Sequence, residues 1–173
     1  DSTDSMAFFI LVNALLATEL TDTATVDKHL LNKLRDKQWE HKEALYAYFY
    51  DRIEMFNDVS SPECSVVVVS NKINEEVLEN LREIGRQKDD NTEVIFVNNG
   101  LEEKIAGRVN EYVDTLIHLK QNAGACMARN FGALFSEGNI LLFIDDDGVP
   151  EEGMLAAHRR RHKEMDIIGA RGA

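Results

Sequence analysis

The sequence predicts an α/β domain with a doubly wound, mostly parallel sheet, preceded by an α-helical N-terminal region. Short, strongly apolar runs recur after residue 62 and alternate with segments of helical periodicity. These runs lack polar alternation, which is typical of strands covered on both faces, as in parallel sheets. Residues 1–60 show only helical spacing among many charges, so we expect a helical region at 1–60 and the α/β domain at 61–173.

The N-terminal region is expected to be helical because its apolar residues recur three or four positions apart. They are Val26, Leu30 and Leu34, and later Leu45, Phe49, Ile53 and Phe56. Residues 58–62 break this pattern, since they end in Pro62 and the residue before a proline disfavours helix. We therefore place the domain boundary near residue 60.

The α/β domain begins with a β-branched run at 65–69, expected to be a buried strand. A helix is predicted at 74–86, where Val77, Leu78, Leu81 and Ile84 share one face. Residues 93–97 then form a second strand that ends in the turn signal Asn98-Asn99-Gly100.

The remaining pattern repeats this alternation. We expect a helix at 101–112, a short strand at 116–119, a helix at 124–136 closed by Gly138, and a fully buried strand at 140–144. Gly132 stands in the middle of its helix, where glycine costs stability, and close packing of that helix on a strand is the expected reason.

Composition excludes several classes of protein. The chain has 173 residues, with 31 acidic against 19 basic side chains, a net charge of −12 that disfavours broad nucleic-acid binding. Its most apolar stretch, residues 6–17, is shorter than the ~20 residues of a membrane-spanning helix and lacks the basic flank of a signal peptide. We expect a cytoplasmic protein, at most peripheral to the inner membrane face. Cys64 and Cys126 are expected to be reduced and buried.

Polar residues follow each predicted strand of the α/β domain. They are Ser70-Asn71, Asn98-Asn99-Gly100, Gln121-Asn122-Ala123-Gly124 and Asp145-Asp146-Asp147. The carboxyl ends of parallel strands share one edge of a sheet, and ligands of such sheets bind there. The sequence therefore predicts a ligand site built from these segments.

The run Asp145-Asp146-Asp147 predicts a divalent cation site. Three adjacent carboxylates repel one another unless a cation neutralises them, and Asp145 and Asp147 can point to the same side of a turn. Magnesium or manganese held by one or two carboxylates usually completes its shell with phosphates and water, so the ligand is expected to carry phosphate.

Two further groups of residues have alternative interpretations. Arg129 lies near the start of its predicted helix, where it serves either an anionic ligand or an ion pair within the domain. His158 and His162 have a spacing that can hold a metal, but they flank Arg159-Arg160-Arg161, so we expect a solvated basic helix face.

The segments SVVVVSN, EVIFVNNG and NAGACMARNFGALFSEGNILLFIDDDGVP resemble family 2 glycosyltransferases of the GT-A fold, over about residues 63–173. The resemblance implies a Rossmann-like donor domain that binds a nucleotide-diphosphate sugar. The donor-binding residues it implies are Ser70, Asn71, Asn98, Asn122, Gly124, Arg129, Asp145 and Asp146. It implies Asp145 and Asp147 as the Asp-x-Asp ligands of Mn²⁺ or Mg²⁺.

The same resemblance implies transfer of a sugar from UDP or GDP, with inversion, to a hydroxyl of an acceptor saccharide or lipid-linked glycan. Family members place the acceptor site and the general base well downstream of Asp-x-Asp, so we expect both beyond residue 173 and the chain alone to be inactive. Asn98 and Asn99 stand where the family often has two aspartates, and Val69 and Asn71 where it often has proline and tyrosine.

Two other interpretations of the sequence stay open at this point. Residues 143–149 also fit the Asp-x-Asp-x-Val turn of haloacid-dehalogenase-like phosphatases, with Asp145 as nucleophile and Asp147 as general acid. Alternatively, the chain is a non-catalytic nucleotide-binding or assembly module, whose helical N-terminal region docks on a partner or a second copy.

Overall fold

The computed structural model describes residues 49–101, 105–165 and 169. Within them, one five-stranded sheet has the order β1-β4-β3-β2-β5. The strands are β1 (Tyr50–Met55), β2 (Cys64–Ser70), β3 (Thr92–Asn98), β4 (Thr115–Leu119) and β5 (Ile140–Asp145). All neighbouring pairs are parallel except β1 and β4, which confirms the predicted α/β class with a mostly parallel sheet.

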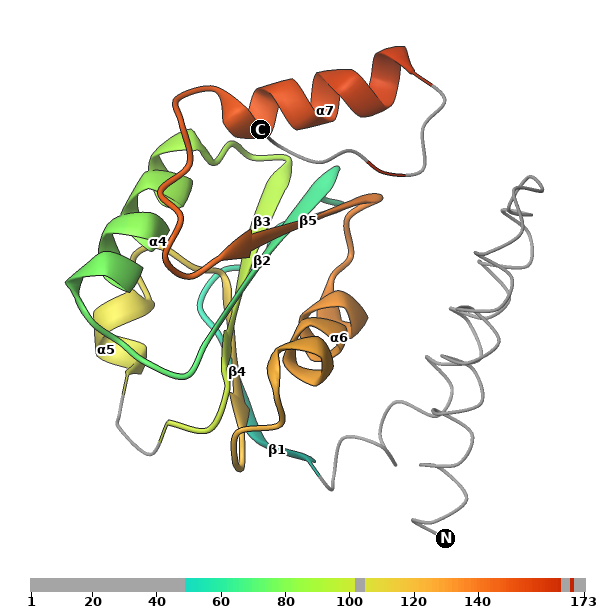
Figure 1. Ribbon diagram of the computed structural model, residues 1–173. Coiled ribbons are helices and arrows are strands. Elements are labelled where there is room, and N and C mark those ends of the chain that lie inside the picture. The colour runs from blue at the N-terminus through green and yellow to red at the C-terminus, as the bar shows by residue number, and fades with distance from the viewer. Residues whose placement is uncertain (1–48, 102–104, 166–168, 170–173) are drawn as a thin grey trace, which may run out of the picture. The chain divides into compact units, whose positions relative to one another are not determined.

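Helices cover both faces of the sheet (Figure 1). α4 (Glu75–Gln87) and the short α5 (Ala106–Val109) lie on one face, α6 (Ala125–Phe135) lies on the other, and α7 (Met154–Glu164) crosses the edge where the parallel strands begin. The larger core lies under α4 and includes Val66, Val68 and Phe96. Val67, next along β2, points to the opposite face, beneath α6.

α4 forms where the sequence places a capped amphipathic helix. The side chain of Asn74 caps its N-terminus by accepting a hydrogen bond from the backbone N–H of Val77 at 3.1 Å, and Glu75 and Glu76 favour the positive end of the helix. Val77, Leu78, Leu81 and Ile84 are buried, as predicted. The capped end and this apolar face fix α4 against the sheet.

α6 packs closely on β2 because Gly132 has no side chain. A Cβ atom at this position would lie 2.2 Å from Cγ1 of Val67, far inside van der Waals contact. The predicted role of Gly132, close packing of helix on strand, is therefore confirmed.

The helical pattern predicted through Ile53 and Phe56 is wrong at its end. Residues 50–55 form β1, which pairs with β4 with a register shift between Tyr50 and Arg52. The register shift interrupts the regular alternation of side chains between the two faces of β1. Over so few residues, the spacing of its apolar residues therefore resembles that of a helix. Contacts within the chain group its residues into two units, Asp1–Phe49 and Tyr50–Ala173. Residues 58–62, where the helical pattern was expected to end, connect β1 to β2 of the same sheet.

The helix expected at 101–112 is much shorter in the described residues, where only Ala106–Val109 is helical. Gly107 and Asn110 are poor helix formers, and the chain turns after Val109 to enter β4. Residues 102–104 lie outside the described part of the chain, as does the helical region expected at 1–48.

β5 is a strand as predicted, but only one of its faces is covered. Leu141 is 37% and Phe143 is 42% exposed, because β5 is an edge strand and α6 lies over β2, β3 and β4. Cys64 is buried as expected, whereas Cys126 is exposed on the first turn of α6, which corrects its predicted burial. Both thiols are free. In the residues that the structure describes, no helix is long and apolar enough to cross a membrane.

Candidate functional site at the carboxyl edge of the sheet

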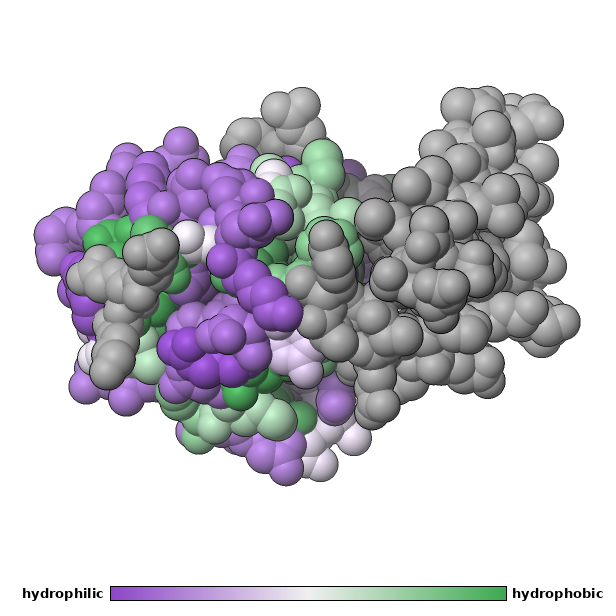
Figure 2. Space-filling view, turned by 90° about the horizontal axis from the view of Figure 1, so that it is seen from below, coloured by the Kyte–Doolittle hydropathy of each residue, from purple (hydrophilic) through white to green (hydrophobic). Residues whose placement is uncertain are grey.

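The parallel register brings the predicted polar segments to one edge of the sheet. Ser70 pairs in register with Asn98, Asn98 with His118, and Val69 with Asp145, so the four parallel strands end side by side. Among the residues that Figure 2 draws in colour, seen from below the ribbon of Figure 1, hydrophilic residues predominate and hydrophobic patches are smaller. The convergence expected from the sequence is thus present in the fold.

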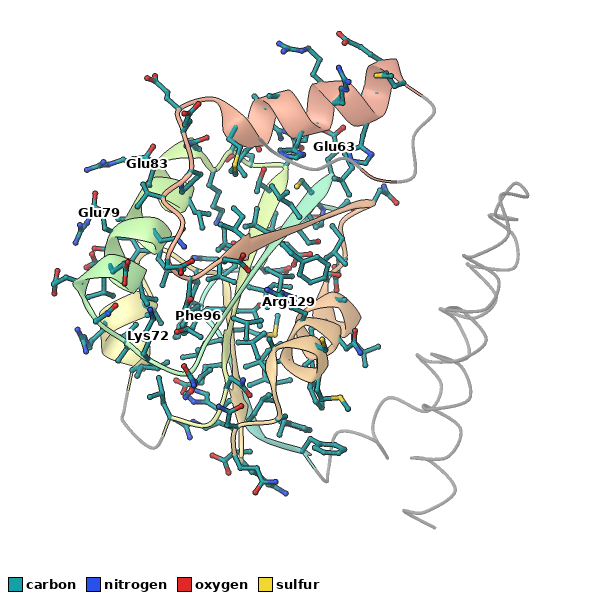
Figure 3. All side chains as sticks on the ribbon, in the orientation of Figure 1. Glu63, Lys72, Glu79, Glu83, Phe96 and Arg129 are labelled. Atoms are coloured by element: carbon teal, nitrogen blue, oxygen red, sulfur yellow. The ribbon has the colours of Figure 1, made fainter. Side chains whose placement is uncertain are left out.

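Asp145, Asp146 and Asp147, here called the acidic turn, leave the end of β5. The carboxylate of Asp145 accepts a hydrogen bond from Nη2 of Arg129 at 2.6 Å. This bond joins the acidic turn to α6, the helix that carries Arg129 (labelled in Figure 3). The two side chains are 70% and 39% exposed, so this ion pair contributes little to folding. Its partners remain accessible to a ligand that offers stronger charges.

Asp146 is held by a buried serine. The hydroxyl of Ser70 donates to the Asp146 carboxylate and accepts from the backbone N–H of Lys72 at 3.1 Å. Ser70 is 2% exposed, so its hydroxyl contacts the acidic turn from inside the protein and does not face solvent.

Asp147 is exposed and makes no side-chain hydrogen bond or ion pair within the described part of the chain. Asn71, which follows β2, is also exposed. The described residues contain no group of three or more His, Cys, Asp or Glu side chains able to hold a metal ion. The acidic turn therefore fits a divalent cation only if that cation takes most of its ligands from a phosphate-bearing molecule and water.

A second cluster, the amide cluster, joins the end of β3 to the start of α6. Nδ2 of Asn99 donates to Oδ1 of Asn122 at 3.1 Å, and Oδ1 of Asn99 accepts from the N–H of Ala123 at 2.9 Å. Oδ1 of Asn122 also accepts from the N–H of Gly124 at 2.9 Å. These bonds fix the path of the chain into α6, and hence the position of Arg129.

Two glycines make the amide cluster possible. Gly100 has φ of +88°, and a Cβ atom there would lie 2.2 Å from the backbone N of Asn122. Gly124 has φ of +81° at the N-cap of α6, a conformation that favours glycine. Gly124 thus contributes by its backbone conformation, and Asn122, which is exposed, by its side chain.

Asn98 occupies a different place from the one expected of a ligand-binding residue. It is fully buried, its Oδ1 accepts from the N–H of Leu101 at 2.8 Å, and its Nδ2 approaches the carbonyl of Leu101 at 3.2 Å and Nδ1 of His118 at 3.0 Å. Every hydrogen-bonding position of the amide except one lone pair is thus engaged within the protein. Asn98 holds the loop after β3, while its neighbour Asn99 belongs to the amide cluster.

His118 continues this buried chain toward β1. Its Nε2 lies 2.9 Å from Oε1 of Glu54, and burial lowers the pKa of the imidazole, with a smaller effect from Arg52. An Asn98 amide that donates to Nδ1 requires the neutral tautomer with hydrogen on Nε2, which then donates to the Glu54 carboxylate. Burial and the bond from the Asn98 amide therefore favour the neutral imidazole, while the Glu54 carboxylate acts on the pKa in the opposite direction.

α7 carries the basic residues of the sequence away from the acidic turn. Arg159 pairs with Asp89 at 2.6 Å, and this contact anchors α7 near the start of β3. His158 and His162 are half-buried, and neither belongs to a group of three metal-binding side chains among the described residues.

Sequence reasoning missed two residues that contact the segment around the acidic turn. Asn80 and Gln87 lie on α4, and their amides reach backbone carbonyls at Asp145, Pro150 and Glu151. The signal was available in part, because Asn80 is a polar residue within the apolar face of α4.

Residues 64–172 match the family model described as glycosyl transferase family 2. An uncharacterized glycosyltransferase of Haemophilus influenzae is 36% identical over 84 residues, which cover 48% of this chain and 29% of that protein. These similarities do not favour the phosphatase or the non-catalytic interpretation.

Among solved structures, S. aureus TarS, residues 1–349, superposes with a TM-score of 0.53 and 20% identity. The similarity covers 64% of this chain and 38% of that one, and it supports the fold alone. The chain thus spans about a third of the length of the proteins it resembles.

Proposed function

Since the chain belongs to glycosyl transferase family 2, we propose that its α/β domain is the donor half of a glycosyltransferase, with the nucleotide-diphosphate sugar bound at the carboxyl edge of the sheet. The observation that carries the proposal is the exposed ion pair between Arg129 and Asp145, 2.6 Å apart beside two further carboxylates. It brings one cationic and three anionic side chains to one strand end, which supports a site for phosphate and a divalent cation.

The acidic turn is proposed to hold Mn²⁺ or Mg²⁺ through Asp145 and Asp147, because Asp147 is exposed and the Asp145 pair is accessible. When bound, the cation would neutralise the negative charge that develops on the departing diphosphate. Asp146 is proposed to act through its hydrogen bond with Ser70, which fixes the turn between the two ligands.

Arg129 and Asp145 are proposed to exchange partners when the donor binds. The guanidinium leaves the carboxylate for a phosphate oxygen, and the carboxylate is released to the cation or the ribose. The exposed pair costs little to separate, and each charge gains a stronger partner. The free state then keeps both groups paired and close to their bound positions.

The edge between β2 and α6 is proposed to bind the nucleoside. Asn71 and Asn122 are exposed there, and amides can both donate to and accept from a base. Asn98 is proposed to act indirectly, by holding the loop that positions Asn99, since its own amide is buried. A uracil or guanine base suits such amides.

The acceptor, inversion at the anomeric carbon and the general base are carried to this chain only as proposals from the family. The base would deprotonate an acceptor hydroxyl of a saccharide or lipid-linked glycan. A partner-docking role of the N-terminal region stays a prediction, because residues 1–48 lie outside the described residues.

Isothermal titration of the 173-residue chain with UDP and with GDP, each with and without Mn²⁺, tests the donor site. We expect one of them to bind more tightly with Mn²⁺. Asp147→Asn should remove most of this enhancement, while Asp90→Asn, an exposed carboxylate before β3, should not. Absence of binding to either nucleotide under all conditions would refute the donor site, and an undiminished enhancement in the Asp147 variant would refute its role as a ligand.

A further inference from the structure

α4 holds both ends of the segment that contains the acidic turn. Nδ2 of Asn80 donates to the carbonyl oxygen of Asp145 at 2.6 Å. Two helical turns further on, Nε2 of Gln87 donates to the carbonyl oxygen of Glu151 at 2.9 Å and approaches that of Pro150 at 3.4 Å. Residues 145–151 are thus fastened to one helix at the point where they leave β5 and again before α7.

Burial of the polar Asn80 side chain costs free energy, which its hydrogen bond to the Asp145 carbonyl offsets. Asn80 is 0% exposed within a face whose other buried members are apolar, and an apolar side chain would be buried there at lower cost. The buried carbonyl oxygens Oδ1 of Asn80 and Oε1 of Gln87 have no hydrogen-bond partner in the described part of the chain. What each amide provides is therefore its N–H group, directed at the segment after β5.

The orientation of the Asn80 amide follows from its partner. If its nitrogen and oxygen were exchanged, two acceptor oxygens would face each other at the Asp145 carbonyl, where one donor is required. Gln87 is half-buried and also approaches Oε1 of Glu83 at 3.2 Å, on the outer side of α4 (Figure 3). The carbonyl bonds of both residues therefore need an amide donor.

Other restraints act near the two ends of the segment, because β5 pairs with β2 up to Asp145 and the carbonyl of Glu151 also accepts from the N–H of Met154 at 3.1 Å. Asp145 is held by Arg129 and Asp146 by Ser70, whereas residues 147–149 are exposed. The weak backbone contact from the N–H of Gly148 to the carbonyl of Asp145, at 3.4 Å, closes the turn on an oxygen that Asn80 already fixes. Among the described residues, α4 thus supplies the side-chain hydrogen bonds that the backbone carbonyls of residues 145–151 accept.

We propose that Asn80 and Gln87 are positioning residues that hold the backbone of residues 145–151 so that the carboxylates of Asp145 and Asp147 meet one divalent cation. The inference rests on the proposed function, because it assigns the two amides to the geometry of the metal and diphosphate site. Neither amide need touch the donor, since both act through the carbonyl groups of the segment.

The test uses near-isosteric replacements in the 173-residue chain. Asn80→Leu and Gln87→Met remove the amides and keep the volume, and Gln87→Lys restores a donor to the carbonyls. Asn57→Leu, an exposed asparagine beside β1, is the matched control. Urea unfolding followed by circular dichroism reports the stability of each variant.

The first measurement needs no ligand. Hydrogen exchange of backbone amides in residues 145–151 should accelerate about five- to tenfold in Asn80→Leu and Gln87→Met, the effect of losing one ordinary hydrogen bond. Gln87→Lys and Asn57→Leu should exchange like the unmodified chain. Unchanged exchange in both amide-deleted variants at preserved stability would overturn the positioning role, whatever the ligand.

The second measurement is the ratio of nucleotide affinity with Mn²⁺ to that without it. Asn80→Leu and Gln87→Met should lower this ratio about five- to tenfold, while binding without metal and the unfolding midpoint hold. Gln87→Lys should recover it. An unchanged ratio in stable variants overturns the link to the metal site, whereas failure of the unmodified chain to bind any nucleotide refutes the proposed function and leaves hydrogen exchange to judge the positioning role.

Discussion

Replacement of Gly132 by alanine should destabilise the domain, although alanine is the better helix former. The added Cβ atom would lie 2.2 Å from Cγ1 and 3.2 Å from Cγ2 of Val67. An ordinary contact of 3.4 Å requires α6 and β2 to separate by about 1.2 Å locally. Val67 is 1% exposed and β-branched, so its side chain has little freedom to turn away.

Two opposing terms set the size of the effect. Overpacking of a close-packed core costs about 1–3 kcal/mol, and the helix propensity of alanine over glycine returns about 1 kcal/mol. The difference between these two terms is a net loss of about 0–2 kcal/mol, and the 2.2 Å approach to Val67 places the expected change toward the upper end of that range. The displacement of α6 should also move Arg129 away from Asp145 and weaken nucleotide binding.

Urea unfolding monitored by circular dichroism measures this change, and Gly107→Ala is the matched control. Nothing lies within 4 Å of the Cβ position at Gly107, so alanine there should leave stability unchanged or raise it by up to about 1 kcal/mol. Combining Gly132→Ala with Val67→Ala should recover part of the loss, as an interaction energy of about 0.5–3 kcal/mol. A Gly132→Ala chain as stable as the unmodified one would refute the close-packing argument.

Three further predictions follow from the titrating groups of the described residues. At pH 8 a thiol reagent should label Cys126 rapidly and Cys64 only after unfolding, because burial raises the pKa of the Cys64 thiol to about 11; equal labelling in the folded chain would contradict this. Burial lowers the pKa of His118 below 6.5, so as pH falls the unfolded chain binds the proton before the folded chain does, and the free energy of unfolding should decrease below about pH 6.5. Urea unfolding at a series of pH values between 8 and 5 should show a weaker dependence of the free energy of unfolding on pH in His118→Gln than in the unmodified chain. The hydrogen bond from Arg159 lowers the pKa of Asp89 from 3.8 to about 2, so this pair stabilises the fold above pH 3.8 and the benefit is lost as pH falls toward 2; a stability difference between the unmodified chain and Arg159→Gln that persists undiminished to pH 2 would count against it.

The fold could be predicted largely from local pattern. The uninterrupted β-branched run of β2 and the amphipathic face of α4 each determine their element within a few residues, and a parallel sheet follows from their alternation. Gly132 predicted close packing of its helix on a strand, because glycine inside a helix lowers stability unless a close contact requires it. These features are local, so the sequence carries them directly.

Errors occurred where pairing partners decided the outcome. The segment that forms β1 has no pattern that separates a strand from a helix over so few residues, and pairing with β4 determines its state. The apolar run at 140–144 predicted a strand covered on both faces. Leu141 and Phe143 are nevertheless exposed, because β5 lies at the edge of the sheet. Strand order is a property of the whole sheet and cannot be predicted from the residues of any one strand.

The sequence by itself determined the acidic turn, the polar strand ends and the family resemblance, because these depend on residue types in consecutive positions. Only the tertiary structure decided what each residue does at the edge: Asn98 is buried and engaged, Arg129 reaches Asp145, and Asn80 reaches the Asp145 carbonyl across 65 positions of the sequence. Such contacts join residues on different elements, and they exist only once α4 and α6 are packed against opposite faces of the sheet.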